Sequence, residues 1–307
     1  MFATETIPVS LYSWQDSGVP TLSASAGSLK NLLKAILVTG YGDKEPLGWE
    51  MPFESPNVAV FRSKAEDSNR HYLRVDNTGI RYANMAGYIA MSGLDSGTDI
   101  FKYNNNYDRF GYLYSGKTAT RGWWLVGHRK AFTFVVTTTY ESTPYLNNES
   151  AMFYFGDVPT VVPQDTGNTI YLASNQNYEY YGSYGLDLMN ESSYLPALFA
   201  RSWDASAVRQ TAALHSLGVH KSNRAVYPDR ITGGTWAAPI YLMESGADYY
   251  NLRGLLPGWY KASNNLKDLR DGAVLPLDGT DDQFLKFNLR NAADDAHFLL
   301  NTSHWQG

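Results

Sequence analysis

Histidines are the residues of this chain best suited to bind a metal ion, and their spacing argues against it. Of the six histidines, His215 and His220 are five positions apart. Two histidines that share a zinc ion on one face of a helix are normally four apart. The remaining ones lie in separate segments, as His71, His128, His297 and His304. We therefore expect surface or hydrogen-bonded histidines, no metal site and no cofactor.

The acidic run Asp278-Gly-Thr-Asp-Asp282 resembles a fragment of a calcium-binding loop. It lacks the alternating aspartates and the closing glutamate that such a loop needs. We predict an acidic turn here.

No arrangement of residues specifies a reaction. The chain has neither a Gly-x-Ser-x-Gly nucleophile elbow nor a glycine-rich phosphate loop after a strand. A glycosidase would need two facing carboxylates, for which Glu179 or Glu191 are candidates, but 30 acidic residues leave that choice undetermined. Cysteine is absent, which excludes disulfides, thiolate zinc sites and cysteine catalysis. We expect a protein that is not an enzyme.

Aromatic residues offer a better candidate for function. Segments 103–114 and 175–185 interleave tyrosine with asparagine and glycine. Such rings stack on sugars or form protein contacts, and they also pack in long loops over a sheet; both explanations stay open. The candidate contact surface consists of Tyr41, Trp49, Tyr103, Tyr107, Tyr112, Tyr178, Tyr180 and Tyr181.

Charge and hydropathy exclude other partners. The net charge of the 307 residues is −5, and no run of lysine or arginine exceeds two, so we expect neither nucleic acid nor anionic lipid to bind. The first ten residues have no signal-peptide pattern, and no stretch approaches the roughly 18 apolar residues that a membrane span needs. We expect no signal peptide and no membrane segment.

The clearest element is a helix over residues 28–39. Its apolar positions recur at helical spacing and form one stripe: Leu29, Leu32, Leu33, Ile36 and Leu37. Ser28 is the predicted N-cap, and Gly40 is predicted to end the helix in a left-handed conformation.

Most of the remaining chain predicts β-strands. The two hairpins pair 58–62 with 71–76 and 123–128 with 131–137, the second of them at the centre of the sheet. Further strands are predicted at 7–14, 82–91, 151–156, 169–173, 239–243, 273–275, 284–288 and 297–300. We predict a loop over 95–122, partly helical structure over 205–217 and a turn-bearing loop over 253–260.

The predicted fold is α+β and β-rich, with a large, mainly antiparallel sheet and the 28–39 helix packed on one face. The polar, tyrosine-rich segment 175–193 suggests a division into a β-rich domain with the N-terminal helix, 1–175, and a second β-rich subdomain, 176–307. A single domain is the alternative.

Several motifs resemble a family of tailed-bacteriophage virion structural proteins. They are Ser28-Leu-Lys-Asn-Leu-Leu33, Leu37-Val-Thr-Gly-Tyr-Gly42, Gly48-Trp49, Pro52-Phe53, Tyr72-Leu-Arg-Val-Asp76 and Arg253-Gly-Leu-Leu-Pro-Gly258. The resemblance implies a virion component of the tail or baseplate, or else of the neck or capsid surface, that assembles in the host cytoplasm. It supplies no catalytic residue.

The function expected from this resemblance is structural, through contacts with other virion proteins and with copies of itself in a symmetric assembly. The alternative is a carbohydrate-binding receptor-recognition protein or depolymerase that uses its tyrosine-rich loops on a host surface glycan. A third possibility is an adhesin that belongs to no virus.

Overall fold

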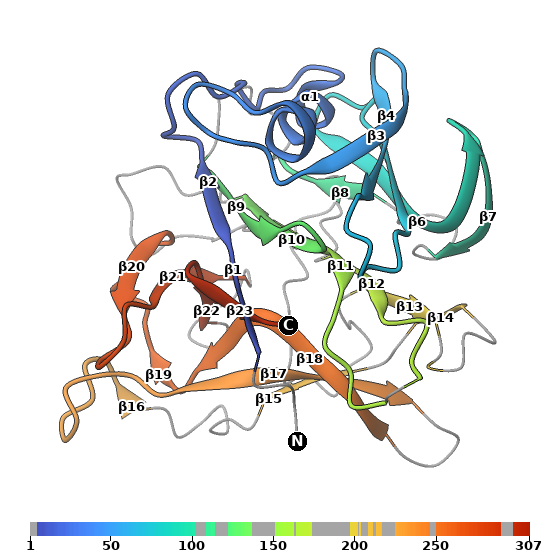
Figure 1. Cartoon of the computed structure of the whole chain (residues 1–307). Helices are drawn as coiled ribbons and strands as arrows, with labels where there is room; N and C mark the ends of the chain where they lie inside the picture. The colour runs from blue at the N-terminus through green and yellow to red at the C-terminus, as the bar shows by residue number, and fades with distance from the viewer. Residues whose placement is uncertain are drawn as a thin grey trace.

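A computed structural model describes residues 5–101, 109–113, 122–136, 151–162, 164–173, 197–201, 203, 208–210, 213–216, 225–245, 250–289 and 297–307. Antiparallel sheets dominate this part of the chain, with one helical run, so the predicted β-rich α+β class is confirmed. The larger sheets lie in layers, with the N-terminal elements at the top of Figure 1, green strands in the middle and the C-terminal strands below.

The first layer holds the helix and a sheet of N-terminal strands. The strand order is β3 (Trp49–Glu54), β4 (Val58–Ser63), β5 (Tyr72–Asp76), β6 (Tyr82–Gly93) and β7 (Ser96–Phe101), and β8 (Arg109–Gly111) also pairs with β6. The predicted hairpin of 58–62 with 71–76 is confirmed by β4 and β5. The predicted loop over 95–122 is wrong where β7 and β8 form, because both strands pair with β6 and so belong to this sheet.

The middle layer is a seven-stranded sheet. Its order is β14 (Val208–Gln210), β13 (Ala197–Arg201), β12 (Thr169–Ala173), β11 (Ala151–Asp157), β10 (Ala131–Val136), β9 (Trp123–His128) and β2 (Ser10–Ser13). The β9–β10 hairpin is confirmed, but β11 occupies the centre and β9 lies next to the edge strand β2. The predicted partly helical structure over 205–217 is wrong for the residues described there, since Val208–Gln210 pairs with β13 and Ala213–Ser216 is a strand as well.

The third layer is a six-stranded sheet. Its order is β15 (Ala213–Ser216), β17 (Ala237–Ser245), β18 (Tyr250–Ala262), β22 (His297–Asn301), β21 (Gln283–Asn288) and β20 (Ala273–Pro276). Two short pairs complete the described strands. They are β1 (Thr6–Pro8) with β23 (His304–Gln306), and β16 (Ala225–Val226) with β19 (Asn264–Asn265), the latter parallel.

Strand β18 overturns the predicted turn-bearing loop over 253–260. Leu255 pairs with Tyr241 and Tyr260 pairs with Pro239, so residues 256–259 bulge opposite one residue of β17. Proline and glycine disrupt a regular ladder but are tolerated in a bulge, where pairing is interrupted. Pro257 and Gly258 lie in this bulge, which is why the segment has turn-like composition and still belongs to a strand.

The middle sheet is buried on both faces. Phe132 and Phe134 of β10 pack in a core with the helix and the first layer, whereas Val135 packs in a second core with the third layer. A strand covered on both sides has no polar alternation. This explains why β10, β11 and β12 consist mostly of apolar residues, with every residue buried except Asp157 at the end of β11.

The helical run occupies residues 28–39 as predicted, with a change of geometry inside it. Helix α1 spans Ser28–Lys34, and a π-helical turn, η1, spans Ala35–Thr39. All five residues of the predicted apolar stripe are buried in the first core. Gly40 follows with a positive φ of 74°, but its ψ of 173° is not the left-handed helical conformation predicted for it.

Ser28 does not cap the helix. The N-cap is Gly27, and the Ser28 hydroxyl instead accepts from the Ser23 amide at 2.8 Å. The first free amides of the helix, those of Leu29 and Lys30, donate to Asn77 Oδ1 at 2.7 and 3.3 Å. A residue 48 positions away from Leu29 therefore supplies the cap, which no local pattern reveals.

Residues on both sides of position 175 share sheets and cores. Strands β13 and β14 extend the sheet begun by β9–β12, and β1 pairs with β23. The division into 1–175 and 176–307 stays a prediction, and its basis, segment 175–193, lies outside the described residues.

Candidate functional site

Two members of the predicted contact surface are core residues. Trp49 is 3% exposed and Tyr112 is 1% exposed. The Trp49 ring packs edge-on against Phe132 with centroids 5.2 Å apart, and its Nε1 donates to the His128 carbonyl at 3.2 Å. Tyr112 accepts a hydrogen bond from Asn77 Nδ2 at 2.9 Å, and burial raises its pKa to about 12. The structure thus corrects their assignment, because both rings are used inside the fold.

Tyr41 is partly buried and also serves an internal contact. Its hydroxyl donates to Asp16 Oδ2 at 2.7 Å, and its ring lies 6.1 Å from that of Tyr12. Burial, and then the Asp16 contact, raise the pKa of Tyr41 above its ordinary value. The other predicted contact residues lie outside the described residues: Tyr103, Tyr107, Tyr178, Tyr180 and Tyr181.

An exposed loop, residues 229–236, is a stronger candidate for contact with a partner. It connects β16 to β17, and it carries Ile231, which is 95% exposed, and Trp236, which is 67% exposed. Large apolar side chains this exposed within one short loop are typical of an interaction site.

Hydrogen bonds hold this loop in one shape. Asp229 Oδ1 accepts from the amides of Ile231 and Thr232 at 3.0 and 2.9 Å and from the Thr232 hydroxyl at 3.1 Å. The Asp229 amide donates to the Gly234 carbonyl at 2.9 Å, which closes the turn. The bonds from Thr232 and Ile231 lower the pKa of the Asp229 carboxyl. The backbone therefore presents Ile231 on a structured turn.

The far end of the loop is fixed by β19 and its neighbour. The Trp236 amide donates to Asn264 Oδ1 at 3.2 Å, and the Trp236 carbonyl accepts from the Ser263 amide at 2.8 Å. Asn264 is fully buried, so this anchor belongs to the body of the protein. The exposed indole consequently stands on a rigid support.

A polar pocket of about 230 Å³ is the second feature of interest. It lies where the β4–β5 loop, the β9–β10 turn, the β11–β12 connection and the β1–β23 pair meet. Its lining includes polar residues from each of the first three segments, which are far apart in the sequence: Asp67, Asn69, His128, Lys130, Asp157, Thr160 and Asn168.

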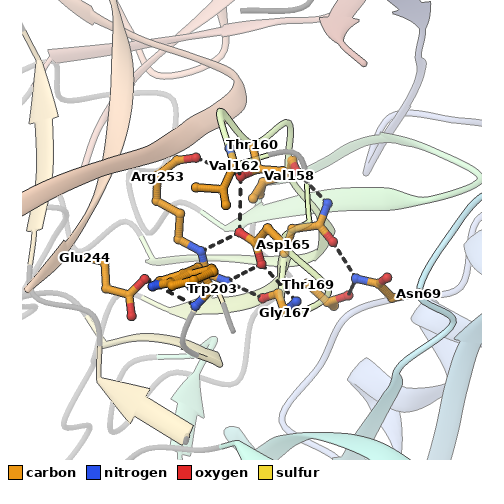
Figure 2. A network of polar contacts seen from close by, with 11 residues as sticks. Asn69, Val158, Thr160, Val162, Asp165, Gly167, Thr169, Trp203, Glu244 and Arg253 are labelled. Carbon is orange, nitrogen blue, oxygen red and sulfur yellow. Dashed lines mark hydrogen bonds and ion pairs between the residues drawn. The ribbon is translucent and has the colours of Figure 1, made fainter. Parts of the chain in front are cut away.

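Hydrogen bonds fix the wall of this pocket. The Asn69 amide donates to Asp157 Oδ2 at 2.9 Å, and Asn69 Nδ2 donates to the side chains of Asn168 and Thr169. Asn168 Nδ2 in turn donates to the Val158 carbonyl at 2.9 Å. Figure 2 shows Asn69 of the β4–β5 loop beside Thr169, at the end of the β11–β12 connection.

His128 lines the pocket in its neutral form. The Lys130 amide donates to His128 Nδ1 at 3.1 Å, so the ring proton resides on Nε2. Burial, and then the positive charges of Lys130 and Arg129, lower the pKa of His128 to about 4, against a smaller opposing effect of Asp67.

Lys130 pairs with Asp67 at the same pocket. Lys130 Nζ and Arg129 Nη2 each lie 3.2 Å from Asp67 Oδ2. Burial raises the pKa of Asp67, but the Lys130 contact and the nearby positive charges outweigh it and lower the pKa. Asp67 is therefore an anion near neutral pH.

A buried ion pair joins the β11–β12 connection, which carries Asp165, to β18, which carries Arg253. Arg253 Nε and Nη2 donate to Asp165 Oδ2 and Oδ1 at 2.7 and 2.9 Å. The Thr160 hydroxyl and the Gly167 amide also donate hydrogen bonds to the Asp165 carboxylate. Arg253 Nη2 donates a further hydrogen bond to the Gly167 carbonyl (Figure 2). Both charged side chains are paired and hydrogen-bonded, so we interpret the cluster as a structural contact that holds the β11–β12 connection against β18.

The sequence interpretation missed both features. The pocket joins residues from distant parts of the chain, such as Asp67 and Asn168, which are 101 positions apart, so it leaves no local pattern. The exposed loop does carry a signal, because an aspartate followed four and five positions later by Gly233 and Gly234 is typical of a turn, with an isoleucine at its tip.

Among the residues that the structure describes, no group of three or more histidine, aspartate or glutamate side chains is arranged to hold a metal ion. The acidic run at 278–282 forms the turn between β20 and β21, where the Leu277 amide donates to the Asp282 carbonyl at 3.0 Å. No described helix is both long and apolar enough to cross a membrane.

Comparison with known proteins gives no assignment. No protein-family model matches this chain, and no curated protein matches it either.

Proposed function

We propose that this protein is a non-enzymatic structural component of a tailed-phage particle, in its tail or baseplate. It acts through contacts with other virion proteins and with copies of itself in a symmetric assembly. The motifs that resemble phage virion proteins motivate the proposal, and the exposed loop, residues 229–236, is the observation in the structure that supports it.

The loop has the properties of a contact site. Burying a fully exposed isoleucine stabilises a complex by roughly 1.5–3 kcal/mol, and tryptophan is among the residues that most often dominate an interface. Because the Asp229 bonds already order the loop, a partner pays little conformational entropy to bind it. An isolated exposed apolar residue would need no explanation, but Ile231 and Trp236 lie on the same structured loop.

The oligomeric state in solution tests the role of the loop. We expect the purified chain to self-associate in sedimentation velocity, and we expect Ile231→Ser and Trp236→Ser each to shift it toward the monomer. Ile80→Ser is the matched control, since Ile80 is also an exposed isoleucine but lies between β5 and β6. Unchanged association in both loop variants would contradict a role of the loop in self-assembly.

The location in a particle needs a separate measurement. Electron microscopy with an antibody against this chain should label the tail or baseplate of the phage whose genome encodes it. Recovery of the protein only from the cytosol of infected cells, with none in purified particles, would argue against a virion role.

A further inference from the structure

The pocket formed by the β4–β5 loop, the β9–β10 turn and the β11–β12 connection has no part in the proposed assembly contact. Drug-sized ligands occupy pockets of roughly 300–1,000 Å³, so a volume of about 230 Å³ suits a smaller molecule. Its wall is held by the Asn69 contacts and exists before any ligand arrives. It is therefore a preformed site for a compact ligand.

The charged groups that line the pocket already have partners within the protein. Lys130 is paired with Asp67, His128 is neutral, and Asp157 already accepts from the Asn69 amide and the Thr169 hydroxyl. An inorganic anion would meet two carboxylates here. A cation would have to compete with Lys130 for Asp67, and with the Asn69 amide and the Thr169 hydroxyl for Asp157. A neutral ligand leaves these contacts intact and brings no charge of its own to bury.

Hydrogen-bonding capacity remains at this site. His128 Nε2–H has no acceptor, and Asn69 Oδ1 has no donor, among the residues that the structure describes. Lys130 and Asp67 add a donor and an acceptor, the latter on a side chain that is 53% exposed. A site that offers both donors and acceptors matches hydroxyl groups, since each hydroxyl both donates and accepts.

Apolar surface completes the pocket. Ile7, Val158 and Pro159 contribute to the lining beside these polar groups. A pyranose ring combines hydroxyls on its rim with carbon-bound hydrogens on its faces, so it needs both kinds of surface. We propose that this pocket binds a single neutral sugar ring, with Asp67, Asn69, His128 and Lys130 as its hydrogen-bonding partners.

Saturation-transfer NMR on the full chain tests this assignment. The probes are D-glucose, D-galactose, N-acetyl-D-glucosamine and, as the competing chemistry, inorganic phosphate. We expect saturation transfer to at least one of the sugars, with a change in the His128 ring-nitrogen shift on titration, and no phosphate-dependent change of that shift.

Variants of the Lys130–Asp67 pair locate the bound sugar. Lys130→Met and Asp67→Asn should each weaken sugar binding about tenfold or more, as loss of a hydrogen bond to a charged group implies. Arg129→Met is the matched control, because Arg129 also pairs with Asp67 but does not line the pocket. It should leave the affinity within about threefold of the wild type, as expected for a solvated surface charge.

Three outcomes would overturn the proposal: no sugar binding by the folded protein, sugar binding that all of these variants leave unchanged, or a His128 shift that responds to phosphate alone. A circular dichroism melt of each variant separates loss of binding from loss of fold. None of these outcomes bears on self-association through residues 229–236, so the two proposals fail independently.

Discussion

His128 shows how a single residue connects several parts of this molecule. Its carbonyl accepts from Trp49, its Nδ1 accepts from the Lys130 amide, and its ring lies edge-on to Trp305 with centroids 5.6 Å apart. Protonation would place a charge among these groups and remove the acceptor that the Lys130 amide uses. Neutrality of this histidine is thus a condition of the native packing.

This condition predicts an acid-sensitive stability. The folded pKa of His128 is about 4, below the ordinary 6.5, so the unfolded chain binds the extra proton first. The resulting loss of stability is absent above pH 6.5 and grows as the pH falls from 6.5 to 4, where it reaches about 3 kcal/mol. Denaturant unfolding of the wild type at a series of pH values measures it.

His128→Asn is the control for this prediction, because the asparagine side chain retains an acceptor for the Lys130 amide and does not titrate. The variant should lose less stability than the wild type between pH 6.5 and pH 4, although its stability at neutral pH is lower. Equal acid sensitivity of the two proteins would show that His128 is not the group responsible.

At the scale of elements, the helix is completed by a residue from another part of the chain. Asn77 is fully buried; its Oδ1 caps α1 and its Nδ2 donates to the carbonyls of Gly79 and Tyr82 and to the Tyr112 hydroxyl. Its backbone carbonyl accepts from the Gly27 amide at 2.8 Å. The residue that follows β5 therefore fixes the start of the helix against the first sheet.

Replacement of this cap has a larger predicted cost than replacement of Ser28. Asn77→Ala leaves several buried groups without partners, at about 1–3 kcal/mol for each, so a loss of at least about 3 kcal/mol in the free energy of unfolding is expected. Ser28→Ala should lose about 1 kcal/mol, since Ser28 bonds only within the preceding turn. Urea denaturation of both variants compares them, and an equal or larger loss for Ser28→Ala would contradict the long-range cap.

At the scale of the whole molecule, the β11–β12 connection fastens the middle sheet to the third layer. The Leu255 amide donates to the Pro159 carbonyl at 3.1 Å, and the Val161 amide donates to the Arg253 carbonyl at 2.8 Å. The Arg253–Asp165 ion pair lies behind these backbone bonds, with both side chains buried (Figure 2). The two layers are consequently joined by a charged contact as well as by their shared apolar core.

Arg253→Met tests this charged contact. The substitution leaves Asp165 as a buried charge without its ionic partner, which typically costs about 3–5 kcal/mol. Arg129→Met is the control, because it breaks an exposed ion pair with Asp67 that contributes about 1 kcal/mol or less. Guanidinium unfolding should separate the two variants clearly, and similar midpoints would mean that the buried pair adds little to the joining of the layers.

Local sequence patterns determined several elements of this fold. The apolar stripe of residues 28–39 specifies a helix with one buried face, because its period is that of the helix. The run Ala131–Val136, rich in aromatic and β-branched residues, specifies a strand. In each case the neighbours along the chain carry the whole signal.

Tertiary structure alone decided how these elements are used. Trp49 is an aromatic residue of the kind found at contact surfaces, but it is buried against Phe132. Segment 253–260 has the composition of a turn, but it forms a strand because a bulge opposite β17 accommodates Pro257 and Gly258. The Asn77 cap and the pocket around His128 bring together residues from distant segments. Such contacts depend on how the layers stack, and no local period or spacing encodes that stacking.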